Sequence, residues 1–251
     1  MFYPRVAYLV RVLLSKIVIV FLFGPLVSTV CAQNEVIQKY RSSLNDWKNG
    51  SVQINGKTII EGLVRYDRNE NIVTIKTKED TRSFNAQGVQ RFEIDDADGM
   101  KYFISSPNKK TSDENATCYF FEILKECGHF ALMMQEKAYT YKKVNNPVLS
   151  TPAGLGQTTR MVVVEKTLYI FDEEGNIKPY MIITESEGVA GISPLPKVKV
   201  HIVDKGLIKY HMGEGDRYTE VKAYAKKNKL SFRDRNDLVT ILTYFKKLES
   251  L

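Results

Sequence analysis

The chain has 251 residues, of which 43% are hydrophobic and 26% are charged, a balance typical of folded proteins and not of disordered chains. The formal net charge is +7, but Arg5, Arg11 and Lys16 lie in an N-terminal segment without acidic residues, so the chain from Gln33 onward carries only +4. This small excess lies entirely in residues 201–251, and it gives no reason to expect a nucleic-acid partner.

The first 32 residues have the features of a secretory signal peptide. Basic residues precede an apolar run from Ile17 to Val30. Cys31 is flanked by Val30, which has a side chain of moderate size, and by Ala32, which has a small one, as expected for a cleavage site just before Gln33. The run has 14 residues, whereas about 20 are needed to cross the hydrocarbon core. We therefore expect cleavage after Ala32 and a periplasmic or secreted mature protein without a transmembrane span. Lipid attachment at Cys31 is the alternative, but it requires a smaller residue than Val30 before the cysteine.

After a short helix predicted at residues 34–46, the hydrophobic pattern changes to the alternation typical of strands. Asn55-Gly56 is a strong hairpin signal. Residues 145–159 and 185–197 are predicted loops, because they are rich in residues that favour turns. Strands are predicted at residues 59–66, 72–77, 82–84, 89–94, 100–104, 119–124, 129–135, 139–144, 160–171 and 177–184.

The end of the chain is predicted to be helical, although residues 198–212 fit a strand and a helix equally well. A helix is predicted over residues 217–228, with Tyr218, Val221 and Ala225 on one side. A second helix, over residues 234–248, has one apolar stripe that should pack against the first helix and the β-domain. The stripe consists of Leu238, Ile241, Leu242, Phe245 and Leu248.

The fold class predicted from these elements is α+β. It combines a predominantly antiparallel, barrel- or sandwich-like β-domain over residues 33–200 with a basic C-terminal helical pair within residues 201–251. Cys118 and Cys127 should lie at opposite ends of one strand. Nine residues of strand span roughly 30 Å, and a disulfide requires Cα atoms about 5–6 Å apart, so no bond is expected between them.

Seven segments of the mature chain carry a family resemblance: residues 47–52, 61–67, 84–93, 120–124, 169–177 and 221–230, with Asp237-Leu238-Val239. Together they resemble a family of secreted Bacteroidetes proteins of unknown function. The similarity extends over almost all of the mature chain, in order, and it implies an envelope or extracellular location. It carries over no catalytic or binding residue.

No catalytic, metal or cofactor site is predicted. Ser193 lies in Gly-Ile-Ser-Pro-Leu, which lacks the last glycine of a nucleophile elbow. The three histidines have no zinc-ligand spacing, and residues 154–159 lack the Gly-Lys-Ser/Thr end of a phosphate loop. Asp95 to Gly99 resembles part of a calcium loop, but two essential ligands are missing, so a β-turn is favoured.

A basic segment near the C-terminus is the one candidate binding surface. For an exported protein its ligand would be an anionic surface such as lipid head groups or acidic glycans, and the alternative is the solvated face of a helix. The residues are Lys222, Lys226, Lys227, Lys229, Arg233 and Arg235, interleaved with Tyr224 and Phe232.

We therefore predict an exported, non-catalytic envelope protein with a binding or structural role and an unidentified envelope partner. Two alternatives are open. One is a secreted glycan hydrolase whose carboxylates are brought together only by the fold. The other is a peripheral envelope protein held by its basic tail.

Overall fold

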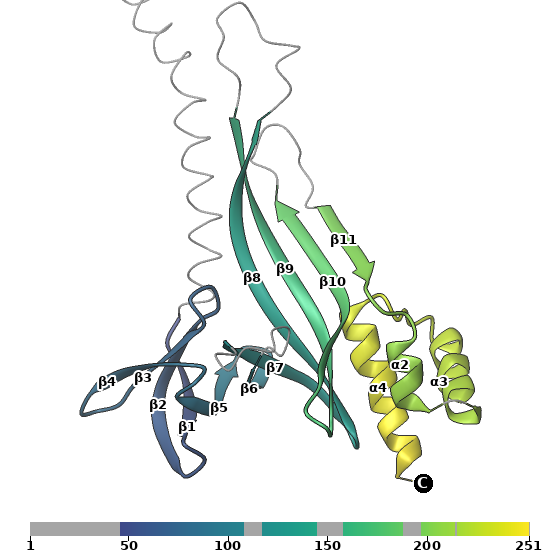
Figure 1. The fold of residues 1–251 in the computed structure, drawn as a ribbon, viewed down its shortest axis with the longest axis horizontal. Helices are drawn as coiled ribbons and strands as arrows, with labels where there is room; N and C mark the ends of the chain where they lie inside the picture. Colours follow the sequence, from purple (N-terminus) through teal and green to yellow (C-terminus); the bar gives the residue numbers. More distant parts are fainter. Residues whose placement is uncertain (1–45, 108–116, 145–157, 188–196, 214, 251) are drawn as a thin grey trace, which may run out of the picture.

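The computed structural model describes residues 46–107, 117–144, 158–187, 197–213 and 215–250 (Figure 1). The predicted signal peptide and nearly all of the helix predicted at residues 34–46 lie outside these residues. The described strands are β1 (Lys48–Ile54), β2 (Thr58–Asp67), β3 (Ile72–Lys76), β4 (Thr81–Asn85), β5 (Val89–Asp96), β6 (Gly99–Pro107), β7 (Cys118–Cys127), β8 (Phe130–Val144), β9 (Thr158–Asp172), β10 (Ile177–Glu187) and β11 (Lys197–Ile202).

All eleven strands belong to one antiparallel sheet, which confirms the predicted fold class. Their order is β11-β10-β9-β8-β7-β6-β5-β1-β2-β3-β4. Every pair of neighbouring strands is therefore also consecutive in sequence, except the pair of β5 and β1. The Asn55-Gly56 turn joins β1 to β2, and both residues have positive φ, as this hairpin turn requires. Cys118 and Cys127 are the first and last residues of β7, and no disulfide joins them.

Three described helices follow the sheet: α2 (Leu207–Met212), α3 (Asp216–Lys227) and α4 (Arg235–Glu249). The ambiguous segment at residues 198–212 therefore contains both a strand, β11, and a helix, α2, instead of one or the other. The side chain of Asp234 accepts hydrogen bonds from the backbone N–H groups of Asn236 and Asp237 and so caps the N-terminus of α4. None of the described helices has both the length and the apolar character needed to span a bilayer.

The sheet has two faces, and the one that carries the core is called the inner face below. Helices α2–α4 cover it over strands β7–β10 (Figure 1). The predicted apolar stripe of α4 is fully buried from Leu238 to Phe245, against Val221 and Ala225 of α3 and against the sheet. Leu132 of β8 and Leu168 of β9 belong to the same cluster, which confirms that the helices pack against the β-domain.

None of the described helices lies over the N-terminal half of the inner face, which is buried by its own curvature. The ring of Tyr66 in β2 lies 5.6 Å from that of Phe120 in β7 and 5.3 Å from that of Phe103 in β6. In a flat sheet β2 and β7, four positions apart, would be about 19 Å from each other at the usual strand spacing of ~4.8 Å. The sheet must therefore curl strongly, and the aromatic rings fill the space that it encloses.

Polar contacts hold this curl where the β2–β3 turn reaches β7 and β8. Asn71 donates to the carbonyl oxygen of Cys118 at 2.9 Å and accepts from the backbone N–H of Phe120 at 3.0 Å, as a paired strand would. Arg68 forms an ion pair with Glu136 at 3.0 Å, and it lies 3.8 Å from Glu122. Both carboxylate side chains are only 9% exposed, so this guanidinium helps to compensate the charge of two poorly hydrated groups.

Two facing glycines allow the strands to bend. Gly50 of β1 pairs with Gly62 of β2. A Cβ atom at Gly50 would collide with the carbonyl oxygen of Glu93, and one at Gly62 with the carbonyl oxygen of Lys76. Glycine is therefore required at both positions because neighbouring backbone approaches too closely for any side chain.

We expect Gly50→Ala to lower the free energy of unfolding by at least about 2 kcal/mol, because its methyl group must displace the backbone of β5. Gly88→Ala is the matched control, since the nearest atoms to its Cβ are 3.8 Å away. Urea unfolding of both variants tests this. Equal stability of the two would show that the close approach at Gly50 does not constrain the curl.

We expect Leu242→Ala to destabilise the whole protein by about 2–5 kcal/mol in one cooperative transition, because Leu242 is fully buried between helices and sheet. Thr243→Ala changes an exposed neighbour in the same helix turn and should be nearly neutral. Chemical denaturation followed by circular dichroism measures both. If deletion of residues 213–251 left the unfolding curve of the sheet unchanged, the helices would be an independent arm.

Candidate functional site

The side of the sheet opposite the inner face is called the outer face, and over β1, β2, β5, β6 and β7 it is hollowed. Two adjoining hollows, of about 830 and 600 Å³, share Ser51, Glu61 and Glu93 in their walls. Such volumes are typical of ligand sites. The two hollows together are called the outer groove.

The register of the strands explains which side chains meet in the outer groove. Ser51 of β1 lies directly opposite Glu61 of β2 on one side and Glu93 of β5 on the other. The row continues from Glu93 to Tyr102 of β6 and then to Ile123 of β7. A parallel row contains Ile59, Gln53, Arg91 and Ile104. Residues that are far apart in sequence are thus placed side by side by the pairing of β1 with β5.

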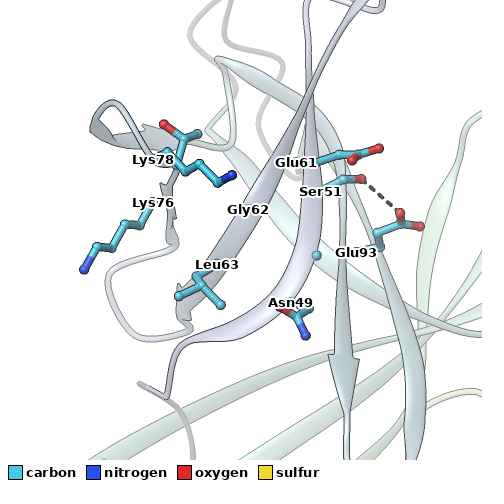
Figure 2. A pocket seen from close by; sticks show the side chains of 10 residues that line it. Asn49, Ser51, Glu61, Gly62, Leu63, Lys76, Lys78 and Glu93 are labelled. Atoms are coloured by element: carbon cyan, nitrogen blue, oxygen red, sulfur yellow. Dashed lines mark hydrogen bonds between the residues drawn. The ribbon is translucent and has the colours of Figure 1, made fainter.

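The centre of the groove is polar. Figure 2 shows Glu61, Ser51 and Glu93 in a row, with the Ser51 hydroxyl donating to Oε1 of Glu93 at 3.0 Å. Glu61 is exposed and Glu93 is half-buried, so both carboxylates are open to a ligand. The side chain of Lys76, at the edge of the smaller hollow, points away from this row (Figure 2).

Positive and negative charges are balanced along the larger hollow. Its acidic residues are Glu61, Glu93 and Glu126, and its basic residues are Arg91, Lys125 and Lys246. Lys246 comes from α4, which packs on the inner face against β7, and it is the one residue of that helix in the lining of the groove. Basic and acidic side chains therefore line it in equal number.

Large apolar side chains are exposed on the same face. Ten are exposed in the described part of the chain, and five of these lie on the outer face of the first six strands or beside it: Trp47, Ile59, Leu63, Met100 and Tyr102. Tyr102 is 51% exposed and Ile59 is 55% exposed, and both line the larger hollow. A concentration of exposed apolar surface around a hollow is typical of an interaction site.

The most strongly buried carboxyl group, Glu122, lies on the inner face and not in the groove. Burial raises the pKa of Glu122, and the nearby Arg68 only partly opposes this effect. The adjacent cavity has a volume of about 30 Å³ and is lined by residues such as Tyr66, Lys48 and Asp96, so it has room for little more than a water molecule. This cluster therefore has a structural role at the joint between the two halves of the sheet and does not admit a substrate.

The turn from Asp95 to Gly99 joins β5 to β6, as the favoured β-turn interpretation predicted. Asp96 accepts hydrogen bonds from Lys48 and Lys101 at 2.5 Å each. Burial alone would raise the pKa of Asp96, but these hydrogen bonds outweigh it and hold the pKa well below its usual range. The carboxylate is thus neutralised by lysines.

The basic residues near the C-terminus are only partly gathered by the fold. Lys222, Lys226 and Lys227 are exposed on α3, and Lys229 and Arg233 are exposed in the connection to α4. Arg235 is half-buried instead, with Nη1 4.0 Å from Sδ of Met134 and with Nε and Nη2 donating to Asn236. Lys226 and Lys227 lie in the last turn of α3, where cations stabilise a helix through its dipole. Anion binding there stays a prediction.

Two of the three histidines, His129 and His211, lie next to each other in the fold, although 82 positions separate them in sequence. His129 lies 2.5 Å through Nε2 from the carbonyl oxygen of His211, and its Nδ1 lies 3.3 Å from Glu249. His211 is buried, and burial lowers its pKa. Within the described ranges no three potential metal ligands come together.

Sequence reasoning missed the groove residues because they come from five strands that only the pairing in the sheet brings together. One signal was available in β6, where Met100, Tyr102 and Ile104 alternate with the buried Phe103. A strand of an antiparallel sheet is usually polar on its solvent side. Apolar residues on both sides therefore indicate a second contact surface.

We expect Glu122 to make the protein less stable as the pH rises above 4.5. Its folded pKa is raised above the ordinary value of 4.5, so the native state binds more protons than the unfolded state between the two pKa values. In Glu122→Gln this dependence should disappear, so the stability of the wild type relative to the variant should fall between pH 4.5 and 7. Urea unfolding at several pH values measures the difference. Glu126→Gln, in the same strand but exposed, is the control, and identical slopes for both variants would contradict the prediction.

No family model matches the chain, and neither a curated protein nor a solved structure is significantly similar to it. The resemblance to secreted Bacteroidetes proteins therefore stays a prediction, and the functional assignment depends on the geometry of the outer groove.

Proposed function

We propose that the protein is an exported, non-catalytic binding protein of the bacterial cell envelope and that its ligand occupies the outer groove. The observation that carries the proposal is the gathering of exposed apolar side chains around a hollow of ligand size. The signal-peptide pattern of residues 1–32 supports export, and the family resemblance supports an envelope location.

Binding accounts for the groove better than hydrolysis does. Glu61 and Glu93 share its wall, and a pair of carboxylates is the arrangement that glycosidases use. A glycosidase acid, however, is kept protonated at neutral pH by burial, and neither Glu61 nor Glu93 is buried. Among the described carboxyl groups, the one whose pKa is raised on balance by burial, Glu122, lies on the inner face.

The basic tail is the second candidate for attachment to the envelope. Its exposed lysines favour contact with anionic lipids, but the position of Lys226 and Lys227 in the last turn of α3 already explains them as stabilising charges. The groove, by contrast, contains Ile59 and Tyr102, which are 55% and 51% exposed and so leave apolar surface open to a ligand.

The proposal is tested by co-sedimentation of the mature protein with cell envelopes prepared from a Bacteroidetes bacterium. We expect the wild type to sediment with the envelopes and a Tyr102→Ala/Arg91→Ala variant to lose at least about tenfold in affinity, because the ring and the guanidinium lie on adjacent strands in the groove. Lys226→Ala/Lys227→Ala is the control and should bind as the wild type does.

Loss of binding in the lysine variant alone, with release by salt, would favour attachment through the basic tail instead. Release of reducing sugar from the envelopes would favour the hydrolase. Export is checked on the same preparation by mass spectrometry of the mature N-terminus, which should begin at Gln33.

A further inference from the structure

Resting on the proposed function, we infer that the ligand of the outer groove is an uncharged oligosaccharide that stacks on Tyr102. The inference narrows the ligand to one chemical class. Three properties of the groove carry it: its charge balance, its exposed aromatic ring and its length across the sheet.

The charge balance argues against a strongly charged ligand. Three acidic and three basic side chains line the larger hollow, and Glu93 and Arg91 alternate along β5. An anionic ligand would be repelled by the three carboxylates and a cationic ligand by the three basic side chains, so the groove as a whole favours neither sign of charge. A sugar hydroxyl group avoids this cost because it donates to a carboxylate and accepts from a guanidinium or an amide.

Tyr102 provides the apolar part of such a site. A pyranose ring has a face of C–H groups and a rim of hydroxyl groups, so it matches a flat aromatic ring surrounded by polar side chains. Tyr102 is half-exposed, with Glu93 directly beside it on β5 and Ile123 beside it on β7. Arg91 and Gln53 lie in the neighbouring row, within reach of a ligand that covers the ring.

The length of the groove favours a chain of sugars over a single one. The row from Glu61 to Ile123 crosses five strands, which corresponds to a path of about 19 Å along the curved surface of the sheet at the usual strand spacing. Glu61 and Ile59 line one end of the groove, and Lys125 and Lys246 line the other end. It is also open to solvent along the exposed side chains, so a polymer can bind from the side and need not pass one end through the groove.

Isothermal titration calorimetry tests the inference with three neutral tetrasaccharides: maltotetraose, cellotetraose and chitotetraose. At least one should bind the mature protein, and tetragalacturonate, which is anionic, should bind more weakly than that sugar. Tyr102→Ala should weaken binding of the neutral sugar at least about tenfold. Tyr102→Phe keeps the ring and should retain most of the affinity, which separates loss of stacking from misfolding.

Tyr139→Ala is the matched control, because Tyr139 is a tyrosine of β8 with 47% exposure that does not line the groove. It should leave the affinity within about twofold. Absence of binding for all three neutral sugars, tighter binding of tetragalacturonate, or equal losses in the two alanine variants would overturn the inference. If envelope binding still required Tyr102 and Arg91 in that case, the proposed function would stand and only the ligand class would be wrong. If envelope binding were also absent, both proposals would fail.

Discussion

An antiparallel sheet of eleven strands has a long apolar face that must be removed from water, and the helices that the structure describes cover only part of it. Helices α2–α4 bury the inner face over β7–β10, and the N-terminal strands bury theirs by curling until Tyr66 meets Phe103 and Phe120. The contacts of Asn71 and Arg68 with β7 and β8 hold this curl. Removing Arg68 would leave two poorly exposed carboxylates, Glu122 and Glu136, without their common partner.

The curl also determines the opposite side of the sheet. Strands that bend around an inner core must bend their outer face as well, and at Gly50 and Gly62 the backbones approach so closely that no side chain fits. Both glycines line the smaller hollow of the outer groove. The constraint that closes the N-terminal core is therefore the one that shapes the candidate site, and α4 completes the wall by contributing Lys246.

The two faces divide the chemistry of the molecule between them. On the inner face, Arg68 lies near Glu122, and Asp96 is paired with Lys48 and Lys101, so these charges hold strands together. On the outer face, Glu61, Glu93 and Arg91 lie near exposed apolar side chains and keep contact with solvent. Groups that are held in fixed pairs stabilise the fold, and groups that keep their hydration can exchange water for ligand hydroxyls at little cost.

The sequence by itself determined the features that depend on near neighbours. Alternating apolar residues predicted most strands within a few residues, Asn55-Gly56 predicted the first hairpin, and the stripe from Leu238 to Phe245 predicted α4 and its burial. The separation of Cys118 from Cys127 followed from the length of one strand. Each of these depends on periodicity or on a local turn, which a single segment specifies.

Only the tertiary structure decided what depends on strand order. The position of β1 between β5 and β2 brings Glu61, Ser51 and Glu93 into one row, and no local sequence pattern predicts the pairing of β1 with β5. The division of residues 198–212 into β11 and α2 depended on the free edge of β10, because the segment itself fits both states. The same holds for Arg235, whose guanidinium lies against Met134 of β8 and not beside the basic side chains that surround it in sequence. Side chains that act together here come from segments joined by sheet register, and the register follows from burying the whole inner face at once.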